Sequence, residues 1–147
     1  MDMKKVVKII CLLLTLVLAL SPAAYAAEQG SKYFSSYDAW IEFSPIYQSR
    51  LHLCFDVSAT DIMDELGVYS IDIMESTDGV NFTTIDTFYP ISFSNMMDYN
   101  SASHGGYVIF YNTVPGRYYK SYVTFWAKLD GGVGMGTTYS EIVRIPN

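Results

Sequence analysis

The feature that most constrains the fold is an alternation of apolar and polar side chains over residues 68–88. Tyr69, Ile71 and Ile73 alternate with polar neighbours, and a period of two is typical of a half-buried β-strand. Asp78-Gly79 follows, and its glycine supplies the positive φ that a tight hairpin turn needs. The return arm is rich in Thr, Ile and Phe, which favour strands. The stretch therefore predicts a β-hairpin with a tight turn.

Similar strand signals recur along the rest of the chain. The clearest covers residues 50–58, where the apolar residues from Leu51 to Val57 point one way and their polar neighbours the other. We interpret residues 59–66 as one helical turn. A short strand is expected near residues 91–93, because a long structureless loop is uncommon inside a compact domain. The remaining predicted elements are strands over residues 37–43, 107–111, 118–129 and 138–145, a turn at residues 114–116 and a glycine-rich loop over residues 130–136.

This pattern of short strands and turn signals, without a convincing long helix, predicts an all-β fold. We expect a two-sheet antiparallel sandwich of seven or eight strands over residues 37–147. Residues 27–36 have little pattern and are expected to form a flexible N-terminal segment.

Residues 1–26 have the three parts of a secretory signal peptide. A positive start is followed by an apolar run over residues 9–20 and by a small-residue cleavage site between Ala26 and Ala27. The apolar run is shorter than the about 20 residues that span a bilayer. We therefore expect a secreted protein that has no membrane contact after cleavage. An uncleaved membrane anchor is the alternative.

Removal of this leader leaves a strongly acidic protein. The chain has 15 acidic and nine basic side chains, and the leader contains Asp2 and three of the lysines. From Ala27 onward the net charge is therefore −8. A surface of this charge repels phosphate backbones and anionic lipids, so we expect neither nucleic acid nor a membrane surface as a partner.

Several segments resemble fibronectin type III domains. The sequence YSIDIMESTDGVNF, which starts at Tyr69, resembles the hairpin between the third and fourth strands of that family. VPGRY, which ends at Tyr118, resembles the corner before the sixth strand, with Tyr118 in the place of the family's tyrosine. Residues 125–127, the glycine loop, Ser140 and Val143 resemble the sixth strand, the next loop and the seventh strand.

The resemblance covers most of residues 37–145 and implies an immunoglobulin-like sandwich. The spacing from Tyr118 to Ala127 is odd, so both side chains face inward only if a bulge lies between them. Fibronectin-like modules mostly bind or space other domains, so the resemblance implies no chemistry. The whole chain also resembles small secreted proteins of Gram-positive bacteria, which implies export from such a cell.

A cysteine-based catalytic group is suggested by composition and opposed by geometry. His52, Cys54 and Asp56 share one predicted strand face and supply the parts of an activated thiol. Neighbours two apart on a strand are separated by about 6.6 Å, whereas a nucleophile and its base need about 2.6–3.2 Å. We therefore expect no catalytic residues and no enzymatic activity.

Cys54 remains a candidate for another role, because it is the one thiol left after cleavage of the leader. An unpaired cysteine in an exported protein can form a disulfide with another chain. We favour the other interpretation, an inert thiol that neighbouring loops partly cover.

The chain has no convincing cofactor signal. Acidic residues gather over residues 56–65 and again at Asp78, beside Asn81, but without the fixed ligand spacing of a calcium loop. We therefore expect no metal. The glycines of residues 132–136 are not followed by a helix, as a phosphate-binding loop requires. No cofactor is expected.

The aromatic side chains are the remaining candidates for function. Two sheets cannot enclose all of them, and exposed tyrosine and tryptophan rings stack on sugars and peptides. Within the irregular residues 93–99, Met96, Met97 and Tyr99 are candidates for an adaptable contact patch. Cross-strand aromatic pairs that only stabilise the sheet are the alternative. The aromatic residues considered are Trp40, Tyr47, Tyr99, Tyr111, Tyr119 and Tyr122.

We interpret the chain as a non-catalytic binding module for an unidentified extracellular protein or glycan. The alternative function is a structural subunit that docks by sheet-edge pairing or through an intermolecular Cys54 disulfide.

Overall fold

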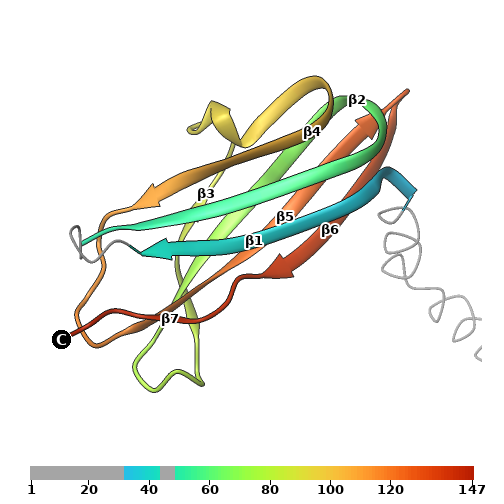
Figure 1. Ribbon diagram of the computed structural model, residues 1–147. Coiled ribbons are helices and arrows are strands. Elements are labelled where there is room, and N and C mark those ends of the chain that lie inside the picture. Colours follow the sequence, from blue (N-terminus) through green and yellow to red (C-terminus); the bar gives the residue numbers. More distant parts are fainter. Residues whose placement is uncertain (1–31, 44–48) are drawn as a thin grey trace, which may run out of the picture.

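The computed structural model describes residues 32–43 and 49–147, so the predicted signal peptide, with Ala26 and Ala27, lies outside the described residues. Seven strands and one short 3-10 helix lie within the described part, and the strands form one antiparallel sheet (Figure 1). The predicted all-β class is therefore confirmed. The elements are β1 (Phe34–Phe43), β2 (Leu51–Ser76), β3 (Thr83–Phe88), η1 (Ser94–Met96), β4 (Met97–Phe110), β5 (Tyr118–Leu129), β6 (Gly132–Tyr139) and β7 (Val143–Arg144).

Within these two described ranges, the chain forms no helix of the length and apolarity that crossing a bilayer requires.

The long strand β2 organises the sheet because it changes partners along its length. Its first half pairs with β1 and β4, and its second half pairs with β5 and β3. The pairing with β4 shifts register between Ser58 and Met63 and then continues to Gly67. The predicted helical turn over residues 59–66 is therefore wrong. These residues are extended because Ala59 pairs with β1 and the pairing with β4 resumes at Met63.

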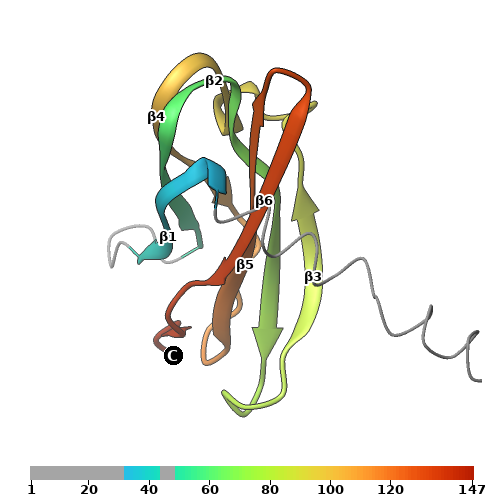
Figure 2. The same cartoon turned by 90° about the vertical axis from the view of Figure 1, so that its right-hand side faces the viewer.

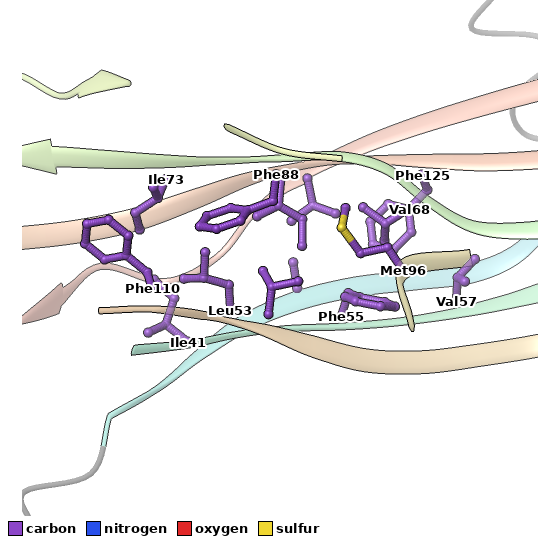
Figure 3. Close-up of a cluster of buried hydrophobic side chains, with 14 of the residues drawn as sticks. Ile41, Leu53, Phe55, Val57, Val68, Ile73, Phe88, Met96, Phe110 and Phe125 are labelled. Atoms are coloured by element: carbon purple, nitrogen blue, oxygen red, sulfur yellow. The ribbon is translucent and has the colours of Figure 1, made fainter. Parts of the chain in front are cut away.

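Side chains from both halves of β2 lie in one buried cluster. Leu53 and Phe55 come from the first half, and Val68 and Ile73 come from the second (Figure 3). The predicted alternation from Leu51 to Val57 is confirmed, because the apolar set is buried. Removal of these side chains from water is the largest favourable contribution to folding, at about 25 cal/mol per Å² of apolar surface.

The predicted hairpin is present, but its turn is not tight. Ile71 on β2 pairs with Phe88 on β3, and a loop over residues 77–82 joins the strands (Figure 2). The Asp78 carboxylate accepts the backbone N–H groups of Val80 and Asn81, which holds its pKa well below the usual range. The positive φ expected at Gly79 is confirmed at 74°.

Tyr69 departs from the predicted alternation. The pairing of β2 with β5 shifts register between Val68 and Ser70, so Val68 enters the core and Tyr69 is 48% exposed. A β-bulge of this kind changes the face to which a side chain points. The inward orientation predicted for Tyr69 is therefore wrong.

Several predicted boundaries are also corrected. Strand β1 begins at Phe34, three residues before the predicted strand and inside the segment predicted to be flexible. Residues 91–93 form a turn rather than a strand, and the strand predicted over residues 107–111 is the end of the longer β4. The predicted turn at residues 114–116 is confirmed by a hydrogen bond from the Arg117 N–H to the Val114 carbonyl.

The glycine-rich stretch predicted as a loop is mostly the strand β6. Only Asp130 and Gly131 form the turn between β5 and β6, and both have positive φ. The last strand, predicted over residues 138–145, is also corrected. β6 ends at Tyr139, and β7 covers only Val143–Arg144.

The alternate glycines of β6 make room for tyrosine rings from the N-terminal part of the domain. A Cβ atom on Gly134 would lie 2.6 Å from Cδ2 of Tyr33, and one on Gly136 would lie 2.8 Å from Cε1 of Tyr37. The Tyr37 ring also packs on Phe125 of β5, with a centroid distance of 5.0 Å. The glycines therefore serve packing rather than loop flexibility.

We predict that Gly136→Ala destabilises the protein by about 1–3 kcal/mol, the usual cost of overpacking. The added methyl group would collide with Tyr37, although alanine normally costs less backbone entropy than glycine. Urea unfolding measures the effect, and Thr137→Ser on the exposed face of β6 is the control. In Tyr37→Ala the collision is absent, so the two substitutions should show coupling. Simple additivity in this double-mutant cycle would contradict the packing argument.

A buried tyrosine joins the start of β5 to the preceding turn. The Tyr119 hydroxyl accepts a hydrogen bond from the Val114 N–H at 2.9 Å and donates one to Glu75 Oε2 at 2.7 Å. The resemblance placed Tyr118 in this role, but Tyr118 lies on the opposite face of β5. Since Tyr119 and Ala127 are an even number of residues apart, both face inward without a bulge.

Burial, reinforced by the bond to Glu75, raises the pKa of Tyr119 to about 12. The unfolded chain ionises at a pKa of about 10. The folded state therefore holds the proton more tightly, and this contribution to stability is complete below pH 10 and is lost as the pH rises toward 12.

We predict that Tyr119→Phe lowers the free energy of unfolding at neutral pH by about 1–3 kcal/mol, because the Val114 N–H and Glu75 lose their partner. The wild type should also lose more stability than the variant between pH 10 and about 12. Urea titrations across that range measure both effects. Parallel stability profiles for the two proteins would contradict the assignment.

Candidate functional site

The structure separates the three residues of the predicted contact patch. Met96, in η1, is 0% exposed and belongs to the core, so its prediction as a contact residue is wrong. Met97 is half-buried and pairs with Gly67, whereas Tyr99 is 64% exposed. Tyr99 pairs with Glu65 of β2, and Glu65 pairs in turn with Lys128 of β5, so Tyr99 lies on the same sheet face as these two residues.

Cys54 is buried in the middle of β2. Only 4% of the residue is exposed, and its strand partners on either side are Trp40 on β1 and Tyr107 on β4. Burial, together with the negative charge of Glu42, raises the pKa of the thiol to about 11. A covered, protonated thiol is a poor nucleophile. This placement argues against the intermolecular disulfide.

The neighbours of Cys54 do not activate it. The thiol donates to the backbone carbonyl of His52 at 3.6 Å, while the His52 ring stacks on Tyr107 with a centroid distance of 4.8 Å. Asp56 is exposed to solvent. The imidazole is therefore engaged with an aromatic ring and is not held as a base for the thiol.

We predict that Cys54 in the folded protein reacts slowly with a thiol reagent such as 5,5′-dithiobis(2-nitrobenzoate) at pH 8. The thiol is protonated and covered under these conditions. Reaction in urea, where the chain is unfolded, is the control and should be fast. Rapid stoichiometric reaction of the native protein would contradict the burial of Cys54.

Three of the acidic residues considered for calcium have protein partners. Asp64 accepts a hydrogen bond from the backbone N–H of Asp130. Glu65 accepts hydrogen bonds from the Lys128 ammonium at 3.0 Å and from the Trp126 indole N–H at 2.9 Å. Asp78 is occupied by the turn described above. Across residues 32–43 and 49–147, no group of three or more His, Cys, Asp or Glu side chains is placed to hold a metal ion.

The strongest candidate surface is the partly exposed face of β5, which we call the β5 outer face. Its side chains alternate with buried ones, as expected for a strand with one face in the core. The strand is hydrogen-bonded to β2 on one side and to β6 on the other. The β5 residues of this face are Tyr118, Lys120, Tyr122, Thr124, Trp126 and Lys128.

Two pairs of aromatic rings lie on the β5 outer face. Tyr122 packs against Tyr139 of β6, with ring centroids 4.7 Å apart. Trp126 stacks on Tyr69 of β2 with a centroid distance of 5.7 Å. Tyr139 is 54% exposed, and Tyr69 is exposed because of the bulge described above. We call these pairs the Tyr122 platform and the Trp126 platform.

A cation lies beside the Tyr122 platform. The Lys120 ammonium is 4.5 Å from the centroid of the Tyr139 ring and 4.4 Å from that of Phe82. Gly79 lies against the ring of Tyr118, so the loop over residues 77–82 rests on this end of β5. Cation–π contacts hold the ammonium without neutralising it.

Sequence reasoning identified only part of this surface. Tyr122 was among six aromatic residues of which some were expected outside, and Tyr119 of that group is buried. Tyr69, Trp126 and Tyr139 were not assigned to a site. The parity of β5 was an available signal, because buried Tyr119 and Phe125 place every even-numbered residue of the strand on the other face. The pairing that brings Tyr139 and Tyr69 to this face is a property of the tertiary structure.

Comparison with protein-family models, with curated protein sequences and with solved structures finds no match to this chain. The candidate site is therefore defined by its own geometry. The arrangement offers flat aromatic surfaces, hydroxyl groups and one ring-bound cation, which suit contact with a ligand.

Proposed function

We propose that this chain is a secreted, non-catalytic binding module whose β5 outer face contacts a glycan or protein at a cell surface. The observation that carries the proposal is the presence of two partly exposed aromatic platforms on one side of one strand. Exposed aromatic rings in a group are typical of binding surfaces. Export is supported by the leader sequence, with cleavage between Ala26 and Ala27, and Gram-positive bacteria are the proposed source.

We further propose that the fold is a two-sheet sandwich of the fibronectin type III or immunoglobulin type. The partner change along β2 supports it, since β1 and β4 flank the first half while β3 and β5 flank the second. The hydrogen bond of Tyr119 to the backbone of Val114 is a second support. Such a tyrosine near the start of a strand, bonded a few residues upstream, is a hallmark of these sandwiches.

A second candidate function is assembly by sheet-edge pairing, and β6 supports it. This strand pairs with β5 over eight residues without a register shift, and it contains no charged residue and no proline. Sheet edges are usually protected by such residues or by bulges. Self-association would therefore use the free edge of β6. The burial of Cys54 makes the disulfide form of this alternative less favourable.

We predict that Tyr139→Ala and Tyr69→Ala each weaken binding to purified cell walls or to a glycan array by at least about fivefold, since a stacked base or ring typically contributes about 1–3 kcal/mol. Tyr107→Ala is the matched control, because Tyr107 is as exposed as Tyr69 but stacks on His52, in the half of β2 that pairs with β1 and β4 rather than with β5. The measurement is the dissociation constant of the monomer for the material it retains.

Three results are informative. Loss of binding in both platform variants, with full binding by Tyr107→Ala, supports the proposal. Equal loss in all three variants would contradict the placement of the site. An association that depends on protein concentration, and is abolished by Thr138→Lys on β6, would favour the assembly function instead.

A further inference from the structure

We infer that the ligand of the β5 outer face is a linear polysaccharide that carries carboxylate groups and lies along β5. This inference rests on the proposed function and names the ligand class of the same surface. It depends on three observations: the order of the side chains along the strand, the position of the cations, and the hydrogen bonds that the backbone of β5 already makes to its two neighbouring strands.

The side chains of the face form a linear series of contact points. The Tyr122 and Trp126 platforms are four residues apart on β5, which corresponds to about 13 Å along a strand. Thr124 lies between them and pairs with Thr137 of β6, so hydroxyl groups occupy the gap. Two stacking surfaces with hydroxyl groups between them match a short run of sugar rings, which present both apolar faces and hydroxyls.

One further polar group borders this series. Asp72 of β2 pairs with Tyr122 in the ladder, and its Oδ1 accepts the Thr87 hydroxyl at 2.7 Å. Its second oxygen can accept a sugar hydroxyl. This carboxylate lies level with Tyr122, so the ligand's charged groups should lie beyond it, at the Tyr118 end of β5.

The cations lie at that end. The mature chain has six Lys and Arg, since three of the nine are in the leader. Arg117 and Lys128 are ion-paired with Glu75 and Glu65. Lys120 and Arg144 form no ion pair with the carboxylates of the described residues.

Both of these cations instead lie against aromatic rings. Lys120 contacts Phe82 and Tyr139, and the Arg144 guanidinium is 5.5 Å from the centroid of the Tyr118 ring. Lys120 and Tyr118 are two residues apart, about 6.6 Å on a strand. An acidic protein thus presents two adjacent positive groups at one end of an aromatic surface, which is complementary to an anionic ligand.

The backbone of β5 favours a sugar chain over an extended peptide. A peptide that adds to a sheet needs free main-chain groups at an edge. β5 is paired with β2 and with β6, so its ladder groups are already occupied. Recognition on this face therefore depends on side chains alone, and stacking with hydroxyl and carboxylate contacts is the way such a surface binds a sugar chain.

The test uses the processed protein and hexamers of galacturonic acid and glucuronic acid, each compared with its own methyl ester. Esterification removes the charge and keeps the sugar rings. We expect the free acid to bind about threefold to tenfold more tightly than the ester, because exposed or partly exposed charge pairs contribute modestly. The difference should shrink as the salt concentration rises. Calorimetry measures the dissociation constants.

Lys120→Gln should remove most of the preference for the free acid, so that the ratio of the two dissociation constants falls toward one. Lys32→Gln, an exposed lysine outside the β5 outer face, is the matched control and should retain the preference. Tyr139→Ala should weaken binding of both the acid and the ester. Circular dichroism verifies that each variant is folded, and Arg144→Gln provides an independent second test of the charge argument.

The remaining outcomes separate this inference from the proposed function. Equal affinity for acid and ester would overturn the inference that the ligand carries carboxylate groups, but it would leave the proposed binding function in place. Binding of a polyglutamate peptide, without binding of either sugar hexamer, would overturn the inference that the ligand is a polysaccharide and would support a protein ligand. No binding of either hexamer, with cell-wall binding that still depends on Tyr139, would also overturn this ligand class. Cell-wall binding that is unchanged in Tyr69→Ala and Tyr139→Ala would overturn both this inference and the proposed function.

Discussion

The structure depends on one physical constraint, which is that the apolar side chains of both halves of β2 must leave water together. A strand as long as β2 buries one face along its whole length only if different neighbours cover its two halves. β1 and β4 meet the first half, and β3 and β5 meet the second. The register shifts along β2 let the chain change direction and keep the core side chains inward.

The same constraint explains where function can reside. Because one face of β5 is committed to the core, the other face has to be exposed to solvent or covered by a partner. The bulge that brings Val68 into the core also turns Tyr69 outward beside Trp126. The Trp126 platform is thus a consequence of how the core is closed. The acidic surface makes the ring-bound Lys120 the more distinctive, since most other charges on the protein are negative.

Glycine has an unusual packing role in this fold. In β6, alternate glycines leave space that Tyr33 and Tyr37 fill, so rings supplied near β1 take the place of side chains that β6 lacks. Aromatic cover of strand glycines is a known way to keep such a strand stable. The edge strand β6 also has no charged side chain that would discourage pairing with another sheet. Assembly through this edge is therefore the competing function.

Much of the fold could be predicted from local pattern. The period of two identified the strands from Leu51 to Val57 and over residues 118–129, and Gly79 marked a turn, because these features depend on each residue's own side chain and its near neighbours. Cys54 was expected on a polar face. A partly covered thiol was one interpretation of this residue, and the structure buries it between strands β1 and β4, where its partners are Trp40 and Tyr107.

The sequence by itself determined the strand-rich character, the acidic charge and the alternation of the strand from Leu51 to Val57. Only the tertiary structure decided that residues 59–66 continue a strand, that Met96 is in the core, and that Tyr119 rather than Tyr118 forms the corner. The reason is physical. Bulges and strand partners are selected by contacts between residues far apart in the chain, and a shift of one residue in register turns a side chain from the core to the surface.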